Sequence, residues 1–223
     1  MTEKAAKLNV ASQGYPSRLQ EKGLPGRFPN LWLVGDASLL NGPLLGLLCS
    51  MRCPGQVIVR TYDLARALRD ASVPVIGGFH SPMEKECLDL LLRGTQPVVI
   101  CPARSICRMR MPASWRSGID AQRVLVVSPF VHLHRRATAA LARERNSLVA
   151  ALATEAVVLH ASPGGQIDTL CRDLIARGSI VWTLDLPENA VAVQAGARPT
   201  NPAQFAHDWG TRNGGSRLAP TPS

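Results

Sequence analysis

Six short apolar runs, separated by stretches of helical spacing, limit the fold of this chain more than any other feature. The runs are Leu44–Leu48, Val73–Ile76, Pro97–Cys101, Val124–Val127, Ala156–His160 and Ile180–Leu184. Strands that are apolar along their length are typical of parallel sheets, because helices cover both faces. The helical spacing between the runs, as in residues 57–71 and 138–153, supplies right-handed crossovers. The pattern predicts an α/β fold with a doubly wound, mainly parallel sheet and helices on both faces.

Regular alternation of predicted strands and helices begins only after residue 43. The chain therefore divides into four parts. The parts are a flexible N-terminus (1–14), a lead-in broken by Pro and Gly (15–43), one α/β domain (44–198) and a C-terminal extension that is partly disordered (199–223). The sequence shows no internal repeat, and we expect no second domain.

Local signals predict where several elements begin and end. Ser81 caps a helix that has Pro82 in its first turn, and Gly94 ends that helix. Shorter elements are expected at 31–35 (strand), 189–194 (helix) and 202–209 (helix), with disorder from Gly210. The Arg-rich stretch between Cys101 and Gln122 has no such signals and is expected to be irregular. We expect the run at 180–184 to be the last strand.

The positive charge of the chain is concentrated in its middle. The formal net charge is +9, from 25 Lys and Arg against 16 Asp and Glu. Between Arg104 and Arg145 there are nine Arg, opposed by Asp120 and Glu144, so this segment holds +7 (9 − 2) of the +9. Guanidinium groups make forked contacts with phosphate, which favours a polyanion or nucleotide partner. The alternative is a solvated basic face that only keeps the protein soluble.

Other features argue against several classes of protein. The N-terminus lacks the apolar run of a signal peptide, and no apolar stretch is long enough for a membrane span. Because no signal peptide is expected, the six Cys should be free thiols in a reducing, cytoplasmic compartment. They show no CxxC spacing, so we expect no metal. Aromatic residues make up 4% of the chain, which argues against nucleic-acid binding mainly by stacking.

Small or turn-forming residues follow four of the predicted strands. They are Cys49-Ser50, Gly77-Gly78, Ser128-Pro129 and Ser162-Pro163-Gly164-Gly165. The carboxyl ends of parallel strands share one edge of the sheet, where ligands of such folds bind. Glycine allows close approach of the backbone, and amides at a helix start favour an anion. We therefore predict a phosphate cradle at this edge, against the alternative that short turns need glycine for geometry alone.

The segment from Pro163 to Thr169 is the most specific of these turns. Its sequence resembles the PGGxGT turn of the lysine-decarboxylase-like phosphoribohydrolases, in which the loop holds a nucleotide phosphate. Asp168 stands near the place of the later Gly of that motif, and Cys171 and Arg172 stand where its catalytic Glu is expected. The resemblance therefore implies a phosphate cradle without the hydrolase chemistry.

A wider resemblance, to the DNA-processing protein A (DprA, also called Smf) family, covers about residues 15–198. The motifs that carry it are Tyr15-Pro16 with Leu19, Leu48–Arg52 for the family's first turn, Ile76–Glu84 for its SGxAxGID turn, Arg145–Ala153 for its RNRIIxxLS helix and Ala161–Asp168 for its SGSLIT turn. The resemblance implies a Rossmann-like form of the predicted fold, related to the nucleotide-binding SLOG superfamily. It also implies a homodimer that binds single-stranded DNA and passes it to the RecA recombinase in transformation.

The chain departs from this family pattern at three places. The arginine of the first turn is displaced by one residue, at Arg52, and Leu88 stands where the family has a His. The winged-helix appendage of many members has no counterpart in the C-terminal extension, so we expect the Rossmann-like domain alone.

Turns, charge and resemblance together give one set of site residues. We expect ligand or phosphate contacts from Ser50, Arg52, Gly77, Gly78, His80, Ser128, Arg136, Arg145, Asn146, Pro163, Gly164 and Gly165, with Arg104 as a further phosphate contact. The sequence favours no catalytic residue and no cofactor, without deciding whether any catalysis survives. Two functions are open: single-stranded DNA binding in transformation or recombination, and a sensor or degenerate phosphoribohydrolase that binds a small nucleotide-derived ligand.

Overall fold

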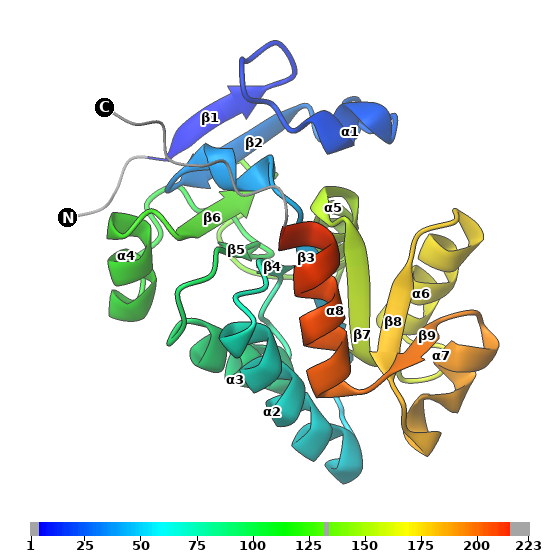
Figure 1. Cartoon of the computed structure of the whole chain (residues 1–223). Coiled ribbons are helices and arrows are strands. Elements are labelled where there is room, and N and C mark those ends of the chain that lie inside the picture. Colours follow the sequence, from blue (N-terminus) through cyan, green and yellow to red (C-terminus); the bar gives the residue numbers. More distant parts are fainter. Residues whose placement is uncertain (1–4, 132–133, 215–223) are drawn as a thin grey trace.

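The computed structural model describes residues 5–131 and 134–214 (Figure 1). Within them the chain forms a nine-stranded sheet in the order β1-β2-β6-β5-β4-β3-β7-β8-β9. The strands are β1 (Ala6–Asn9), β2 (Asn30–Val34), β3 (Leu45–Cys49), β4 (Val75–Gly77), β5 (Val98–Ile100), β6 (Val124–Ser128), β7 (Glu155–His160), β8 (Val181–Leu184) and β9 (Arg198–Thr200). The expectations of flexibility for residues 1–4 and disorder for residues 215–223 fall outside the described residues.

The direction of the strands confirms the predicted doubly wound, mainly parallel sheet. All pairs among β3 to β9 are parallel, whereas β2 pairs antiparallel with both β1 and β6 at one edge. The chain moves outward from β3 through β4, β5 and β6, and then continues with β7 on the other side of β3. The order therefore reverses between β3 and β7, and open α/β sheets bind ligands beyond the carboxyl ends of the strands at such a reversal.

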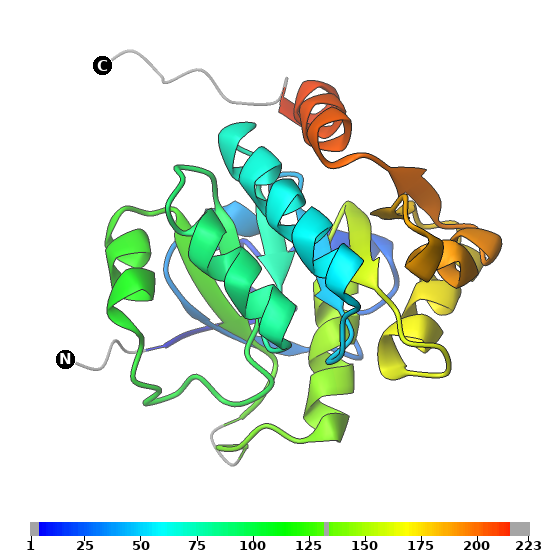
Figure 2. The same cartoon turned by 90° about the horizontal axis from the view of Figure 1, so that it is seen from below.

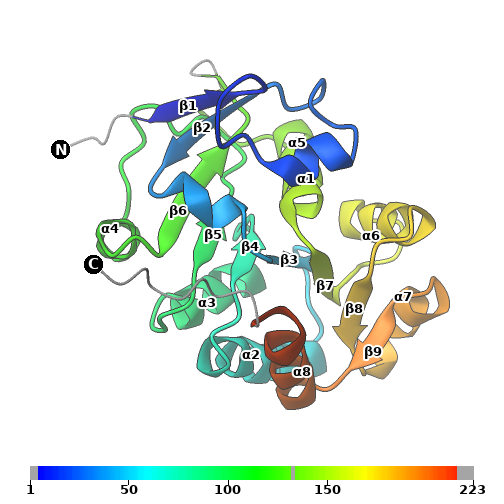
Figure 3. The same ribbon diagram turned by 45° about the horizontal axis from the view of Figure 1, so that its top comes forward.

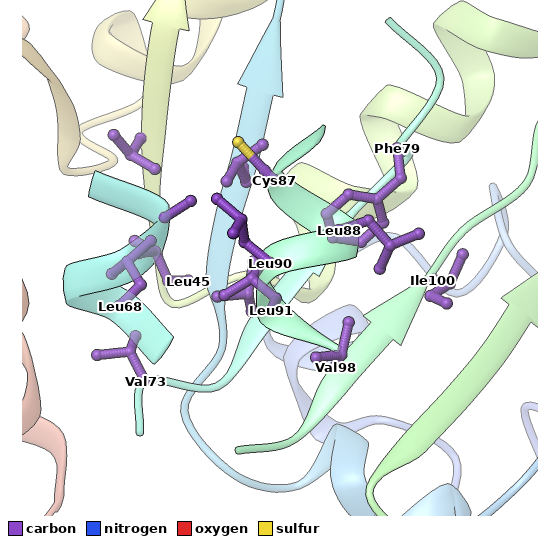
Figure 4. Close-up of a cluster of buried hydrophobic side chains, with 14 of the residues drawn as sticks. Leu45, Leu68, Val73, Phe79, Cys87, Leu88, Leu90, Leu91, Val98 and Ile100 are labelled. Carbon is purple, nitrogen blue, oxygen red and sulfur yellow. The ribbon is translucent and has the colours of Figure 1, made fainter. Parts of the chain in front are cut away.

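Helices cover both faces of this sheet. One face carries α2 (Gly55–Asp70), α3 (Pro82–Leu91), α4 (Ala113–Asp120) and α8 (Pro202–Gly214), and the other carries α1 (Ser17–Glu21), α5 (Ala139–Leu152), α6 (Gln166–Ala176) and α7 (Ala190–Gln194). Successive strand residues enter opposite layers, with Val98 in the first and Val99 in the second. Figure 4 shows part of the first layer, where Leu68 of α2 and Leu91 of α3 lie close to the sheet. None of the described helices is long and apolar enough to span a membrane.

The N-terminal end and the Arg-rich middle contain more structure than we expected. Residues 6–9, expected to be flexible, form β1, because their backbone pairs with β2. The segment expected to be irregular contains α4, whose Ile119 packs into the core of the first layer. Both elements are short and carry few apolar residues, so their stability comes from tertiary contacts rather than from local pattern.

The C-terminal end also differs from the prediction. Strand β8 is not the last strand, because β9 pairs with it and closes that edge of the sheet. Helix α8 continues past the expected end at Trp209 to Gly214, within the stretch that we expected to be disordered. Phe205 and Trp209 are fully buried, and Figure 3 shows α8 beside α2. The extension is therefore part of the core as far as the structure describes it.

The start of α3 confirms the predicted cap and allows a stability test. Ser81 Oγ accepts a hydrogen bond from the Glu84 N–H at 3.3 Å, and the Glu84 carboxylate accepts one from the Ser81 N–H at 3.0 Å. We expect Ser81→Ala to lower the free energy of unfolding by about 1 kcal/mol, because one amide of the first turn loses its acceptor. Urea unfolding followed by circular dichroism measures this change, and Ser114→Ala, at an exposed site in α4, should leave stability nearly unchanged.

Candidate functional site

A cavity of about 620 Å³ opens where the strand order reverses, and we call it the switch-point cavity. Its wall comes from the turn after β3, the start of α3, the start of α5 and the turn from β7 into α6. The polar lining residues are Ser50, Arg52, His80, Ser81, Glu84, Thr138, Arg145, Asn146, Ser162 and Gln166. Four crossovers thus meet at the edge of the sheet where the sequence predicted a ligand.

The carboxylate of Glu84 accepts hydrogen bonds from backbone N–H groups that we expected to be free. Its Oε1 accepts a hydrogen bond from the Cys49 N–H at 3.0 Å, and its Oε2 accepts from the N–H groups of His80 at 2.8 Å and Ser81 at 3.0 Å. Glu84 itself is only 3% exposed. The expected cradle of bare amides after β3 and β4 is therefore largely filled, because a carboxylate of the protein already holds these donors.

Arg145 is a buried cation on α5. Its Nη1 donates to the Cys101 carbonyl oxygen at 3.1 Å, and the residue is 3% exposed. Burial lowers the pKa of Arg145, and the nearby Glu84 carboxylate offsets part of this shift. The guanidinium packs against Gly78, where the Cβ of any other residue would overlap it. Gly78 is therefore needed for the position of Arg145 rather than for a turn alone.

Two polar atoms of α5 at this cavity lack a hydrogen-bond partner among the described residues. They are Nε of Arg145 and Oδ1 of Asn146, and both residues line the cavity. A buried donor or acceptor without a partner costs about 1–3 kcal/mol, so such atoms are uncommon unless a ligand or ordered water uses them. These two atoms are buried polar groups of the cavity wall that still need a partner, from a ligand or from ordered water.

The turn after β7 uses some of its amides internally. Ser50 Oγ accepts a hydrogen bond from the Ser162 N–H at 2.9 Å, which joins the ends of β3 and β7. Asp168 Oδ2 accepts one from the Gly164 N–H, also at 2.9 Å. Ser50 and Gly164 are thus structural in this turn, which narrows the set of groups that can hold a phosphate.

The first turn of α6 keeps amides that a ligand can reach. Among the described residues, the N–H groups of Gln166 and Ile167 have no hydrogen-bond acceptor, and both residues line the cavity. A helix N-terminus carries a partial positive charge. This helix start is the open remainder of the predicted amide cradle.

Comparison with models of known protein families identifies the family of this chain. A family model described as DNA recombination-mediator protein A matches residues 7–182, which is most of the chain. The chain belongs to this family. The family that the sequence motifs indicated is thereby confirmed.

Solved structures of DNA-processing protein A share the fold. The protein from Streptococcus pneumoniae superposes with a TM-score of 0.75 at 16% identity, covering 91% of this chain and 73% of that one. The protein from Helicobacter pylori gives 0.71 at 18% identity, covering 94% and 97%. A molybdenum cofactor carrier protein from Chlamydomonas reinhardtii gives 0.51 at 12% identity, covering 76% and 99%. No curated protein sequence matches the chain.

In this member of the DNA recombination-mediator protein A family, six of the predicted site residues line the switch-point cavity. They are Ser50, Arg52, His80, Arg145, Asn146 and Gly165. Gly78 contributes by accommodating Arg145, and Gly77 is buried against the ring of Phe79. Pro163 and Gly164 are exposed in the same turn as Gly165 but do not line the cavity.

Ser128 and Arg136 do not line the switch-point cavity. The nine arginines between 104 and 145 also do not form one surface. Ser128 is buried and its Oγ donates to the Arg104 carbonyl oxygen at 2.8 Å, while Arg136 is exposed before α5. Arg123 lies at the amino edge and donates to the Leu92 carbonyl oxygen at 2.6 Å. The segment crosses from β5 through α4 and β6 to α5, so its charges are distributed over both edges of the sheet.

Sequence reasoning missed the less polar part of the cavity wall. Met51, Ala142 and Ile167 line it, and Met51 is 60% exposed at the rim. Ala142 stands one helical turn before Asn146, and the N-cap residue Thr138 stands about two turns before it, so both lie on its side of α5. Helical periodicity counted back from Asn146 was the signal that could have identified Thr138 and Ala142.

A larger cavity, of about 900 Å³, lies at the opposite edge of the sheet. It is lined by residues that precede β3, β4 and β5 and by α8. The turns that hold the family motifs are at the carboxyl edge, so we assign the site to the smaller cavity. Among the described residues, no group of three or more His, Cys, Asp or Glu is placed to hold a metal ion.

The thiols of Cys49 and Cys53 beside the cavity give a pH-dependent prediction. A hydrogen bond from the Cys49 thiol lowers the pKa of Cys53 and raises that of Cys49. A lowered pKa means that the Cys53 thiolate is present at lower pH, so we expect its alkylation by iodoacetamide to start below the usual thiol range. In the Cys49→Ala variant, the pH midpoint of Cys53 alkylation should rise. Mass spectrometry of the labelled peptides over a pH series measures both midpoints, and an unchanged midpoint would contradict the thiol pair.

Proposed function

We propose that this protein binds single-stranded DNA and that the switch-point cavity is the binding site. The observation that carries the proposal is the pair of buried atoms without partners, Arg145 Nε and Asn146 Oδ1, in a cavity at the reversal of strand order. Family membership supports it, since the Helicobacter pylori relative is described as having a single-stranded DNA binding mode. The role in DNA processing would be transformation or recombination.

The charges of the wall suggest how a strand would lie. The Glu84 carboxylate on the inner wall repels a phosphate, so the phosphates would stay at the rim, near Arg52 and the start of α6. The Asn146 amide offers a donor and an acceptor, which suits the edge of a base. Met51 and Ile167 supply apolar contact. In this arrangement a base enters the cavity and the backbone stays outside.

The proposal includes the partners implied by the family. We expect a homodimer that acts in the cytoplasm and passes the strand to RecA, and all six cysteines are free thiols, which suits a reducing compartment. Light scattering at micromolar concentration tests the dimer, and a monomer mass would remove that part. The proposal contains no catalytic step.

A small nucleotide is the second candidate ligand. A cavity of about 620 Å³ lies within the usual range for small-molecule sites, and among the described residues no Phe, Tyr or Trp lines it to stack successive bases. Thermal shift separates the two functions: stabilisation by a mononucleotide together with indifference to oligonucleotides would favour the sensor.

Fluorescence anisotropy with labelled oligo-dT tests single-stranded DNA binding directly. We expect binding at low salt, with log affinity falling by about 0.7 per phosphate contact for each tenfold rise in salt. Arg52→Gln should weaken binding and reduce this slope by about 0.7, because one phosphate contact is lost. The matched control is Arg66→Gln, an exposed arginine on α2 outside the lining of the cavity. Absence of binding at low salt would refute the proposed function.

A further inference from the structure

A second cavity on the same edge of the sheet is lined mainly by arginines. It measures about 660 Å³, and its lining residues are Arg104, Ser105, Cys107, Arg108 and Arg135. They come from the loop after β5 and the loop after β6. These parallel strands are neighbours, so both loops start from the carboxyl edge that holds the switch-point cavity. In Figure 2 the two loops lie along one side of the molecule, the side from which α5 begins.

Hydrogen bonds join the two loops that form this cavity. Ser128 Oγ at the end of β6 donates to the Arg104 carbonyl oxygen at 2.8 Å. The Ser105 N–H donates to the His134 carbonyl oxygen at 2.7 Å. Arg108 has a φ of 62°, in the left-handed region, so the chain makes a tight turn there. The two loops that carry the arginines are therefore held together by hydrogen bonds and do not move independently.

The charges around this cavity have no counter-charge within the described part of the chain. Arg104, Arg108 and Arg135 make no salt bridge there, and no acidic residue lines the cavity. Nε of Arg104 is buried and has no hydrogen-bond partner. Three cations around one space repel each other, and an anion with several oxygens would relieve the repulsion and provide the missing acceptor.

We propose that Arg104, Arg108 and Arg135 form a second contact site, which binds backbone phosphates of the same DNA strand that enters the switch-point cavity. Forked guanidinium groups match phosphate oxygens, and the described residues that line the cavity include no aromatic ring to hold a base. The site reads no sequence and fixes the path of the strand along the carboxyl edge. This inference rests on the proposed function, since it assumes that a strand is bound.

Anisotropy titrations of the full chain with long and short oligo-dT test the second site. The test variant is Arg108→Gln with Arg135→Gln, both exposed side chains. The matched control is Arg93→Gln with Arg177→Gln, two exposed arginines after the ends of α3 and α6, at the amino edge of the sheet. Both variants lose the same net charge, so a difference between them reports position and not overall charge.

We expect the test variant to bind the long strand at least about tenfold more weakly, with a salt slope lower by about 1.4, because two phosphate contacts are lost. The control variant should stay close to the wild type. A strand too short to leave the switch-point cavity should bind the test variant and the wild type equally. Equal binding of the long strand by test and control variants would overturn the second site alone. Absence of binding by the wild type would instead refute the proposed function, and the second site with it.

Discussion

Replacing Gly78 by alanine is expected to abolish most of the single-stranded DNA binding and to destabilise the fold. A Cβ at position 78 would overlap the guanidinium of Arg145, so either the arginine or the turn after β4 must move. Overpacking in a core costs about 1–3 kcal/mol. A displaced Arg145 also loses its hydrogen bond to the Cys101 carbonyl oxygen. Since each 1.4 kcal/mol is a factor of ten, we expect oligo-dT affinity to fall at least about tenfold.

Chemical unfolding and oligo-dT anisotropy on the same protein samples measure both effects of Gly78→Ala. Gly55→Ala is the matched control, because a Cβ at Gly55 meets no atom within 4 Å. That control should keep the affinity and stability of the wild type. If Gly78→Ala bound oligo-dT as tightly as Gly55→Ala, the position of Arg145 would be irrelevant to binding and the site would need to be reassigned.

The layered sheet was predictable because its information is local. Apolar runs such as Val124–Val127 are buried on both faces, and only a parallel sheet covered by helices accommodates them. The start of α3 was equally clear, since Ser81 and Glu84 form a capping box within four residues. By contrast, β1 has mostly exposed side chains and is held by its pairing with β2. No local pattern marks a strand of that kind.

The candidate site was predictable only in outline. Parallel strands place their following turns on one edge, and this correctly brought Ser50 and Gly165 to one cavity. The occupant of the amides was not predictable, because the Glu84 carboxylate reaches back to Cys49, a residue far away in the sequence. The arginines could not be located from their clustering along the chain, because the segment from Arg104 to Arg145 crosses the sheet.

Removal of the Glu84 carboxylate should give the largest loss of stability at this site. Glu84→Ala leaves the N–H groups of Cys49, His80 and Ser81 without their acceptor, and it leaves the buried Arg145 without its nearest negative charge. Removing one partner of a buried charge network costs about 3–5 kcal/mol, a large share of the stability of a single domain.

Unfolding of Glu84→Ala and Glu84→Gln in guanidinium chloride separates the stability contributed by the hydrogen bonds of the carboxylate from that contributed by its charge. The amide oxygen of glutamine still accepts a hydrogen bond, so Glu84→Gln should lose about half as much stability as Glu84→Ala. Glu86→Ala on the same helix is the control, because Glu86 is exposed and only accepts a hydrogen bond from the Tyr62 hydroxyl. A loss for Glu84→Ala no greater than for Glu86→Ala would mean that solvent satisfies the amides as well as the carboxylate does. In that case these turns would be able to receive a phosphate after all, and the placement of the DNA backbone at the rim would have to be reversed.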